Sequence, residues 1–307
     1  MRLRVAALAL FMSAWAILCS GPSSALSAAS TFALRATADR SAAQQISEPL
    51  RGFGASVTAA YEGWFDNADG SHNFLIGYLN RNFNQAVDVP IGPNNTMGPN
   101  GPDLGQPTHF LPGRQTGVFM VTVPKEFGPK ERITWSITVN GQTTSIPFWM
   151  NADYQVSPFA DIAVGNKPPV VRFDPSGATI QGPITTIAKA ISRTATMSAG
   201  LTLPIWASDD AKFSSGNNAP QRNPPPPVIL HWSKYRGPGN VTFDKPSSTF
   251  EKIDGPAAFN GKSTLNAKFS APGEYVLHVT AEDYSGPGGG GEVCCWTTAM
   301  VRVVVTP

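Results

Sequence analysis

Short runs of alternating apolar and polar residues recur along the chain from residue 56 to residue 306, and turn-forming residues separate them. Alternation with a period of two predicts strands with one buried face, and Asp-Gly or Asn-Gly between two such runs is typical of a hairpin. In the N-terminal half, Asp69-Gly70 and Asn140-Gly141 stand at such places. The strands predicted in this half span residues 56–65, 72–80, 116–124, 132–139 and 142–150.

The C-terminal half shows the same pattern after a proline-containing boundary near 160–168. Its predicted strands lie within 196–210, 228–243, 263–283 and 294–306. Residues 184–193 are the one place where we expect a short helix. Many short strands joined by turns favour a sandwich. The sequence therefore predicts an all-β protein with two Ig-like antiparallel β-sandwich domains, at 55–160 and 165–307.

The N-terminus has the features of a secretory signal peptide. Arg2 and Arg4 precede an apolar run over 5–19, and small residues that suit cleavage after Ala25 or Ala29 follow it. The alternative is an uncleaved anchor helix, but the run is shorter than the roughly 20 residues that span a bilayer. We expect a signal peptide at 1–29, a leader or linker at 30–54, and a secreted, periplasmic or cell-surface protein without a transmembrane segment in the mature chain.

Charge gives no sign of a nucleic-acid partner. The chain has 23 Lys and Arg against 21 Asp and Glu, and loss of Arg2 and Arg4 with the signal peptide leaves 21 of each. A balanced surface does not favour nucleic acid or an anionic membrane. Glycine (29) and proline (28) are abundant, which agrees with many tight turns.

Two segments of the C-terminal half carry a family resemblance. "HWSKYRGPGNVTF" (231–243) followed by "AKFSAPGEYVLHVTAED" (267–283) resembles the PKD-type immunoglobulin-like domain of extracellular proteins. The resemblance covers about 165–307, and it implies an Ig-like sandwich. Insertions at 211–227 and 285–291 depart from the family pattern. The N-terminal module resembles no family that we identify.

The physical properties of single residues lead to the same fold. Trp232, in mid-strand, is a bulky core residue, and Tyr275 stands at a strand start where a tyrosine corner forms. Leu277 occupies the position where antibody-type domains have a core cysteine. We therefore expect an aliphatic core without an inter-sheet disulfide.

No motif in the chain indicates an enzyme. There is no His-Glu-x-x-His and no Gly-x-Ser-x-Gly, and the four histidines are scattered. "GPGGGG" (286–291) matches a nucleotide-binding pattern by composition only, since no helix follows it. The sequence predicts a non-catalytic protein.

Acidic residues are predicted to meet at one end of the C-terminal sandwich, where the loops after two strands converge. They are Asp209, Asp210, Glu282, Asp283 and Glu292. Carboxylate oxygens are ligands that Ca²⁺ prefers, so calcium is the only cofactor that we consider. The alternative is that these side chains only solvate turns.

Two histidines and a group of aromatic residues form two further candidate sites. With Trp232 inward, alternation turns His231 and His278 outward on neighbouring strands, as a metal-binding or ordinary surface pair. Aromatic side chains crowd the first predicted hairpin, and most belong in a core. An exposed subset could stack on sugar rings, and the candidates there are Tyr61, Trp64 and Tyr78. Trp296, beside the cysteine pair of the C-terminal half, is a further candidate for stacking.

Cys294 and Cys295 are adjacent, and Cys19 leaves with the signal peptide. Alternation predicts that one thiol faces the core and the other faces solvent. Three outcomes stay open: two free thiols, a bridge between two molecules, or a disulfide between the neighbours. The last would delay the following strand until Trp296.

The prediction for function is an exported binding, adhesion or structural protein whose partner is a protein or a glycan at the cell surface or in the periplasm. A carbohydrate-binding protein that uses aromatic residues of the N-terminal module is the alternative.

Overall fold

Strands make up nearly all the regular structure in the computed structural model, which describes residues 48–99, 101–161, 165–212, 225–285 and 294–307. Two single-turn 3₁₀ helices are the only helices among these residues: η1 (Ala152–Tyr154) and η2 (Ile187–Lys189). The all-β prediction is confirmed. The helix expected at 184–193 amounts to η2, after which the chain enters a strand.

The N-terminal module (49–161) contains three small antiparallel sheets. One has the order β1-β2-β6, a second has the order β4-β7-β8, and β3 pairs with β5. Asn140 and Gly141 both have positive φ, which suits the two-residue hairpin turn between β7 and β8. The strands are β1 (Val57–Asp66), β2 (His72–Asn80), β3 (Val87–Asp88), β4 (Asn95–Gly98), β5 (His109–Phe110), β6 (Gly113–Val123), β7 (Ile133–Val139) and β8 (Gln142–Phe148).

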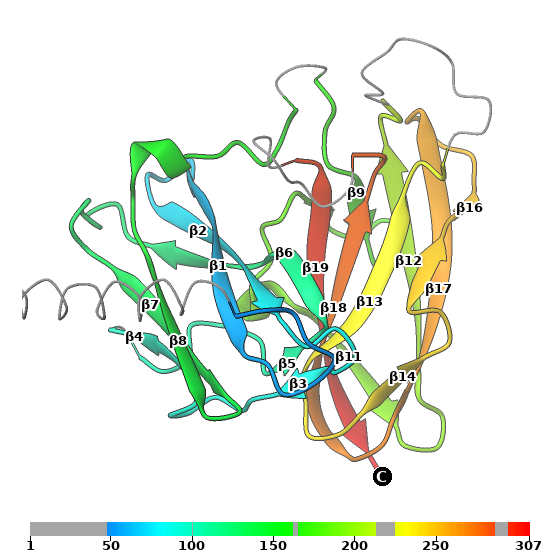
Figure 1. Ribbon diagram of the computed structural model, residues 1–307. Coiled ribbons are helices and arrows are strands. Elements are labelled where there is room, and N and C mark those ends of the chain that lie inside the picture. The colour runs from blue at the N-terminus through cyan, green and yellow to red at the C-terminus, as the bar shows by residue number, and fades with distance from the viewer. Residues whose placement is uncertain (1–47, 100, 162–164, 213–224, 286–293) are drawn as a thin grey trace, which may run out of the picture. The chain divides into compact units, whose positions relative to one another are not determined.

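The C-terminal module (165–307) is a sandwich of two larger sheets (Figure 1). One sheet has the order β10-β9-β12-β17-β14, with β16 also paired to β17. The other has the order β11-β19-β18-β13-β15, in which β11 and β19 are parallel. The strands are β9 (Val170–Arg172), β10 (Ile180–Gln181), β11 (Ile191–Thr196), β12 (Leu201–Asp209), β13 (Ile229–Arg236), β14 (Val241–Phe243), β15 (Ser247–Thr249), β16 (Glu251–Lys252), β17 (Phe259–Phe269), β18 (Gly273–Glu282) and β19 (Trp296–Thr306).

The predicted tyrosine corner is present. The Tyr275 hydroxyl donates to the carbonyl oxygen of Ala271 at 2.8 Å, and the ring is fully buried. The Gly-Pro-Gly turn after β13 fits around this ring. A Cβ on Gly237 would lie 2.1 Å from Tyr275 Cδ1, and one on Gly239 would lie 2.7 Å from its hydroxyl oxygen. The two glycines are therefore needed for the close approach of the turn to Tyr275.

The core of the C-terminal sandwich is aliphatic and aromatic, as predicted. Trp232 and Leu277 are buried in it, and no cysteine joins the two sheets among the described residues. The core of the N-terminal module includes three residues of the C-terminal module: Tyr235, Val276 and Met300.

The N-terminal module therefore packs on the outer face of β13, β18 and β19. A third buried cluster joins Phe65, Leu75 and Met120 of the N-terminal module to Trp296. Residues from Pro49 onward form one compact unit by their contacts. Separate folding of the two modules, with a boundary near 160–168, stays a prediction.

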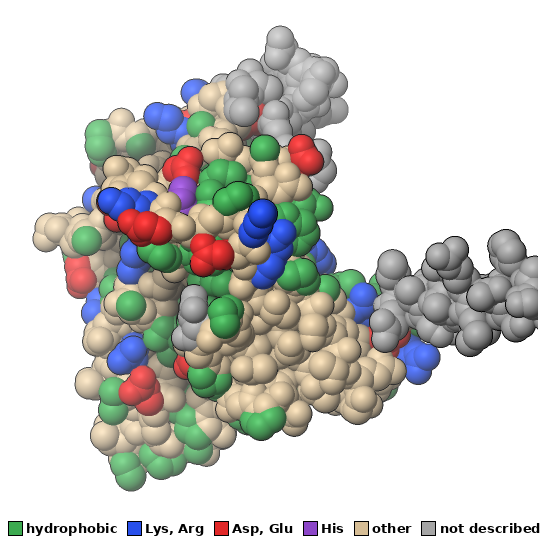
Figure 2. Space-filling view, turned by 90° about the vertical axis from the view of Figure 1, so that its left-hand side faces the viewer, with side chains coloured by type: hydrophobic (Ala, Val, Ile, Leu, Met, Phe, Trp, Pro, Cys, Tyr) green, Lys and Arg blue, Asp and Glu red, His purple; other side chains and the backbone are tan. Residues whose placement is uncertain are grey.

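The signal peptide predicted at 1–29, and most of the leader, lie outside the described residues. Within the described part of the chain, no helix has the length and apolar character needed to cross a membrane. Figure 2 shows acidic and basic side chains interspersed on one face of the molecule. This face has no broad area of a single charge sign.

Candidate functional site

A cleft of about 560 Å³ lies between the two modules, beside β13 and β18, and we call it the inter-module cleft. The N-terminal module contributes apolar lining at Pro107 and Leu111. The C-terminal module contributes polar side chains from the outer face of its sheet, namely His231, Ser233, Thr280 and Glu282. Arg114, Gln115 and Thr116 add polar groups to the same wall. The cleft thus combines a wall of apolar and polar side chains with a floor of hydroxyl, imidazole and carboxylate groups.

His231 and Glu282 are the two ionisable residues of this floor. His231 Nε2 lies 3.6 Å from Glu282 Oε2, and the His231 side chain is about half exposed. Burial raises the pKa of the Glu282 carboxyl, while the nearby His231 acts in the opposite direction. The imidazole and the carboxyl group can form hydrogen bonds with a ligand in the cleft.

His278 does not form the exposed pair with His231 that alternation suggested. Its side chain does leave β18 on the outer face, but the N-terminal module buries it there. Its Nε2 lies 3.0 Å from the carbonyl oxygen of Val118, and its ring stacks on Tyr235. Burial lowers the pKa of His278 to about 4, so the ring is neutral at pH 7. Because a carbonyl only accepts, Nε2 carries the proton.

Polar contacts around the cleft fix one module on the other. The Arg236 guanidinium donates to both carboxylate oxygens of Asp103, at 2.9 and 2.7 Å, and to the carbonyl of Gln106. This hydrogen bonding lowers the pKa of Asp103. The Tyr235 hydroxyl donates to the carbonyl of Gly105 at 2.5 Å. Sequence reasoning missed these contacts, since they join residues more than 100 positions apart.

A second ionic contact joins the modules nearby. Lys234, which is 8% exposed, places Nζ 2.9 Å from Asp88 Oδ1. His109 Nδ1 lies 2.9 Å from the same oxygen. The hydrogen bond from His109 and the contact with Lys234 lower the pKa of Asp88 to about 2. The Asp88 carboxylate therefore stays ionised and links the N-terminal module to Lys234 of the C-terminal module.

The predicted acidic end is assembled in part. Asp209 and Asp283 are both 5% exposed and interact electrostatically with each other and with Asp210. Burial, and then the neighbouring carboxylates, raise the pKa of Asp209 to about 7. Glu282 instead faces His231, and Glu292 lies outside the described residues.

Asn166 is a member of this acidic end that sequence reasoning missed. Its Nδ2 donates to Asp283 Oδ2 at 2.6 Å, and Ser285 donates twice to the other carboxylate oxygen. Asn166 Oδ1 and Asp209 Oδ1 are buried without a hydrogen-bond partner among the described residues. No three His, Cys, Asp or Glu side chains come close enough to hold a metal ion in that part of the chain. Calcium binding at the acidic end therefore stays a prediction.

Cys294 and Cys295 are joined by a disulfide to each other, which is one of the three outcomes left open. β19 begins at Trp296, as expected for this outcome. The prediction of one solvent-facing sulfur is wrong, because both residues are buried. Asn166 and Ser285 lie against the pair: Cys295 Sγ is 3.5 Å from the Asn166 carbonyl, and the Cys295 N–H donates to Ser285 Oγ. The disulfide therefore packs beneath the acidic end.

The aromatic residues proposed for sugar stacking belong largely to the core. Trp64, Tyr78 and Trp296 are buried and present no open ring face. Two of them form hydrogen bonds with the backbone: Trp64 Nε1 donates to the Asn151 carbonyl, and the Tyr78 hydroxyl accepts from the N–H of Leu111.

Tyr61, the fourth candidate, is half-buried. Its hydroxyl donates to the Trp149 carbonyl, and its ring contacts Tyr154 and Phe148. The prediction of exposed aromatic side chains in a row on the N-terminal module is wrong, because Tyr61, Trp64 and Tyr78 pack in or against the core of that module. Trp296 is buried where the two modules meet.

Comparisons with known proteins identify no family. No protein-family model matches the chain, and no curated protein matches it. Among solved structures, domains 4 and 5 of the S-layer protein SbsC align with 82% of this chain and 98% of their own length, at 10% identity and a TM-score of 0.22. A TM-score this low supports no inference about the present chain.

Proposed function

We propose that the mature chain is an exported, non-catalytic binding protein of the cell surface or the periplasm, and that its ligand occupies the inter-module cleft. The observation that carries the proposal is the composition of this cleft. Both modules line it, its wall is apolar at Pro107 and Leu111, and its floor offers the hydroxyls of Ser233 and Thr280 beside His231 and Glu282. Sites for small ligands combine an apolar surface with a few placed polar groups in this way.

The contacts between the modules support the same role. Arg236 with Asp103, and Lys234 with Asp88, connect the two modules that line the cleft. A preformed site loses little conformational freedom when a ligand binds, which favours affinity. We include in the proposal that the C-terminal module is of the PKD type, as its sequence suggests.

The partner is a protein segment or a glycan. A ligand with polar edges and an apolar face suits the cleft, and a sugar ring has both. Carbohydrate binding therefore stays the alternative proposal, although three of the four aromatic residues first considered for it are buried.

Amide NMR titration of the mature protein with short saccharides and peptides tests the proposal. We expect binding compounds to shift the resonances of His231, Ser233 and Thr280. A His231→Ala, Thr280→Ala variant should lose this response, while Lys125→Ala, on an exposed lysine outside the cleft, should keep it. Compounds that bind only elsewhere, or equal binding by the cleft variant and the control, would contradict the proposal.

A further inference from the structure

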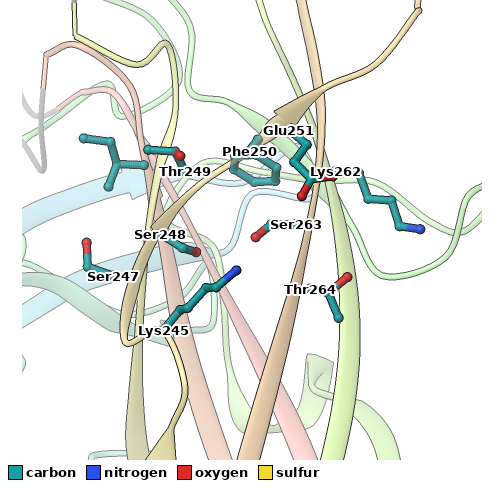
Figure 3. A pocket seen from close by; sticks show the side chains of 10 residues that line it. Lys245, Ser247, Ser248, Thr249, Phe250, Glu251, Lys262, Ser263 and Thr264 are labelled. Carbon is teal, nitrogen blue, oxygen red and sulfur yellow. The ribbon is translucent and has the colours of Figure 1, made fainter.

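A separate cavity of about 660 Å³ opens at the edge of the C-terminal sandwich, and we call it the edge groove (Figure 3). β15 ends at Thr249 in one sheet and β16 begins at Glu251 in the other, so the chain crosses between the sheets at Phe250. The groove lies at this crossing. The groove is therefore the place where the space between the two sheets opens to solvent.

Two serines with short side chains leave space in the groove. Ser248 pairs with Leu230 in one sheet, and Ser263 pairs with Ile205 in the other. Leu230 and Ile205 are fully buried core residues. Since directly paired residues share a face, both serines point into the space between the sheets. Apolar residues normally fill such inward positions, so two short hydroxyls leave room for a ligand.

Phe250 provides an apolar surface in the groove. Its ring is half-buried and makes an edge contact with Phe259, with 6.3 Å between the ring centroids. A Cβ on Gly261 would lie 2.5 Å from Phe250 Cβ, so the glycine is required for Phe250 to lie across β17. The ring is thereby held next to Ser263.

Lys245 adds a positive charge at the same place. Figure 3 shows its ammonium group directed toward the hydroxyls of Ser248 and Ser263, whereas Lys262 points away from them. Lys262 Nζ instead lies 5.3 Å from the centroid of the Trp206 ring. The charge of Lys245 acts on its neighbour Asp244, but no carboxylate in the described part of the chain lies within ion-pair distance of its Nζ. Neither serine hydroxyl has a hydrogen-bond partner among those residues.

We propose that the edge groove binds an acidic saccharide. An ammonium group and two hydroxyls without protein partners converge there and can donate to one carboxylate, while the face of a sugar ring lies on Phe250. The remaining lining includes Thr249 and Thr264, whose hydroxyls both donate and accept, as the hydroxyls of a sugar do. It also includes Ser247, which lines the inter-module cleft as well, and the carboxylate of Glu251, which stands opposite Lys262 on the paired strand. The proposal concerns a site other than the inter-module cleft, although it rests on the proposed binding role.

An acidic peptide fits the groove less well. Peptides commonly bind at a sheet by adding a strand to its free edge. The edge strands here are short, since β15 has 3 residues and β16 has 2. They offer few backbone groups to an added strand. The hydroxyl-rich lining and the single aromatic ring favour a saccharide.

The test is amide NMR titration of the mature protein with short oligomers of galacturonate and of glucuronate, beside neutral oligomers of galactose and glucose. We expect an acidic oligomer to shift Ser248 and Ser263, with an affinity that falls as salt rises. Lys245→Gln should weaken it at least roughly tenfold, because a hydrogen bond to a charged group is lost. Lys252→Gln, on the neighbouring exposed β16, is the matched control and should bind as the unaltered protein does. Ser263→Ala should weaken binding by a smaller factor.

Several results would overturn this assignment. They are silence of both acidic oligomers, equal binding of the neutral ones, or the same affinity for Lys245→Gln and Lys252→Gln. Binding of inorganic phosphate or of triglutamate in place of the saccharides would show an anion site or a peptide site. Shifts confined to His231 and Thr280 would reject the edge groove and leave the inter-module cleft in place, so the two proposals fail separately.

Discussion

The two sheets of the C-terminal sandwich share one core, but their outer faces differ. On β12 and β17 the outer face meets solvent: Trp206 is half-exposed, and Lys262 and Lys268 are exposed. On β18 and β19 the outer face lies against the N-terminal module, which buries His278, Trp296 and Met300. The strands are consequently buried in different patterns. β12 alternates between buried and accessible residues, while β18 and β19 are buried almost continuously in their middle parts.

The difference shows how a second module changes the environment of a strand without changing its conformation. β18 and β19 are antiparallel strands like β12 and β17, and antiparallel sheets often have one solvated face. Here the outer face carries large side chains and closes the inter-module cleft on one side. The face that is covered thus holds His231 and Glu282 side by side at its margin, whereas the open face carries lysine side chains such as Lys262 and Lys268.

Tryptophan truncation on each face should give the largest contrast. Trp296→Ala removes a fully buried indole between the modules, and we expect a loss of roughly 3–5 kcal/mol in the free energy of unfolding. Trp206→Ala removes an indole on the open face that contacts Lys262, and it should cost only about 1 kcal/mol. Urea unfolding of both variants is the measurement. Equal losses would mean that the N-terminal module does not bury the outer face in solution.

A fall in pH should lower the stability of the folded protein through His278, on the covered face. Its pKa in the folded protein is lowered to about 4 by burial, while an exposed histidine titrates near 6.5. The unfolded chain therefore binds a proton more readily between these values. The stability that neutral His278 provides is complete above about pH 6.5 and is lost as pH falls toward 4. The loss approaches about 3 kcal/mol, since each pKa unit corresponds to 1.36 kcal/mol.

Histidine variants separate this effect from general acid denaturation. In thermal melts from pH 7 to pH 4, His278→Gln should have a shallower fall in melting temperature than the unaltered protein. His231→Gln, at the accessible margin of the cleft, should retain the original slope. The assignment fails if the slope is unchanged in His278→Gln.

The longer strands of the fold were predictable because each depends on local pattern, whereas β11 begins within the residues where a short helix was expected. β2 spans His72–Asn80, as the alternation and the Asp69-Gly70 turn indicated, and the tyrosine corner follows from the position of Tyr275 after Pro272-Gly273. The covered outer face was not predictable in the same way. No local pattern in "EYVLHVTAE" indicates that another module covers His278. The large side chains of Trp296 and Met300 at outward positions were the one signal that this face is covered.

The candidate sites depended on long-range placement and were predicted less well. Asp209 and Asp283 were expected to meet from the ends of two strands, and they do interact. Asn166, which bonds Asp283, precedes the first strand of its module, and no pattern linked it to them. The inward Ser248 and Ser263 lie in strands whose registers are fixed only by pairing, so the edge groove could not be inferred from the sequence.

A glycine substitution gives the smallest and most local test of the covered face. Gly117 and Gly113 both lie in β6 with positive φ, so alanine at either position strains the backbone. A Cβ on Gly117 would lie 2.2 Å from Trp296 Cζ2, while one on Gly113 would meet nothing within 4 Å. We therefore expect Gly117→Ala to destabilise the protein by about 1–3 kcal/mol more than Gly113→Ala, since overpacking adds to the shared backbone strain. The difference between the two free energies of unfolding in urea isolates the contact between β6 and Trp296. If the two variants are equally stable, then β6 and Trp296 are not in close contact, and the covered face at this point is looser than the structure describes.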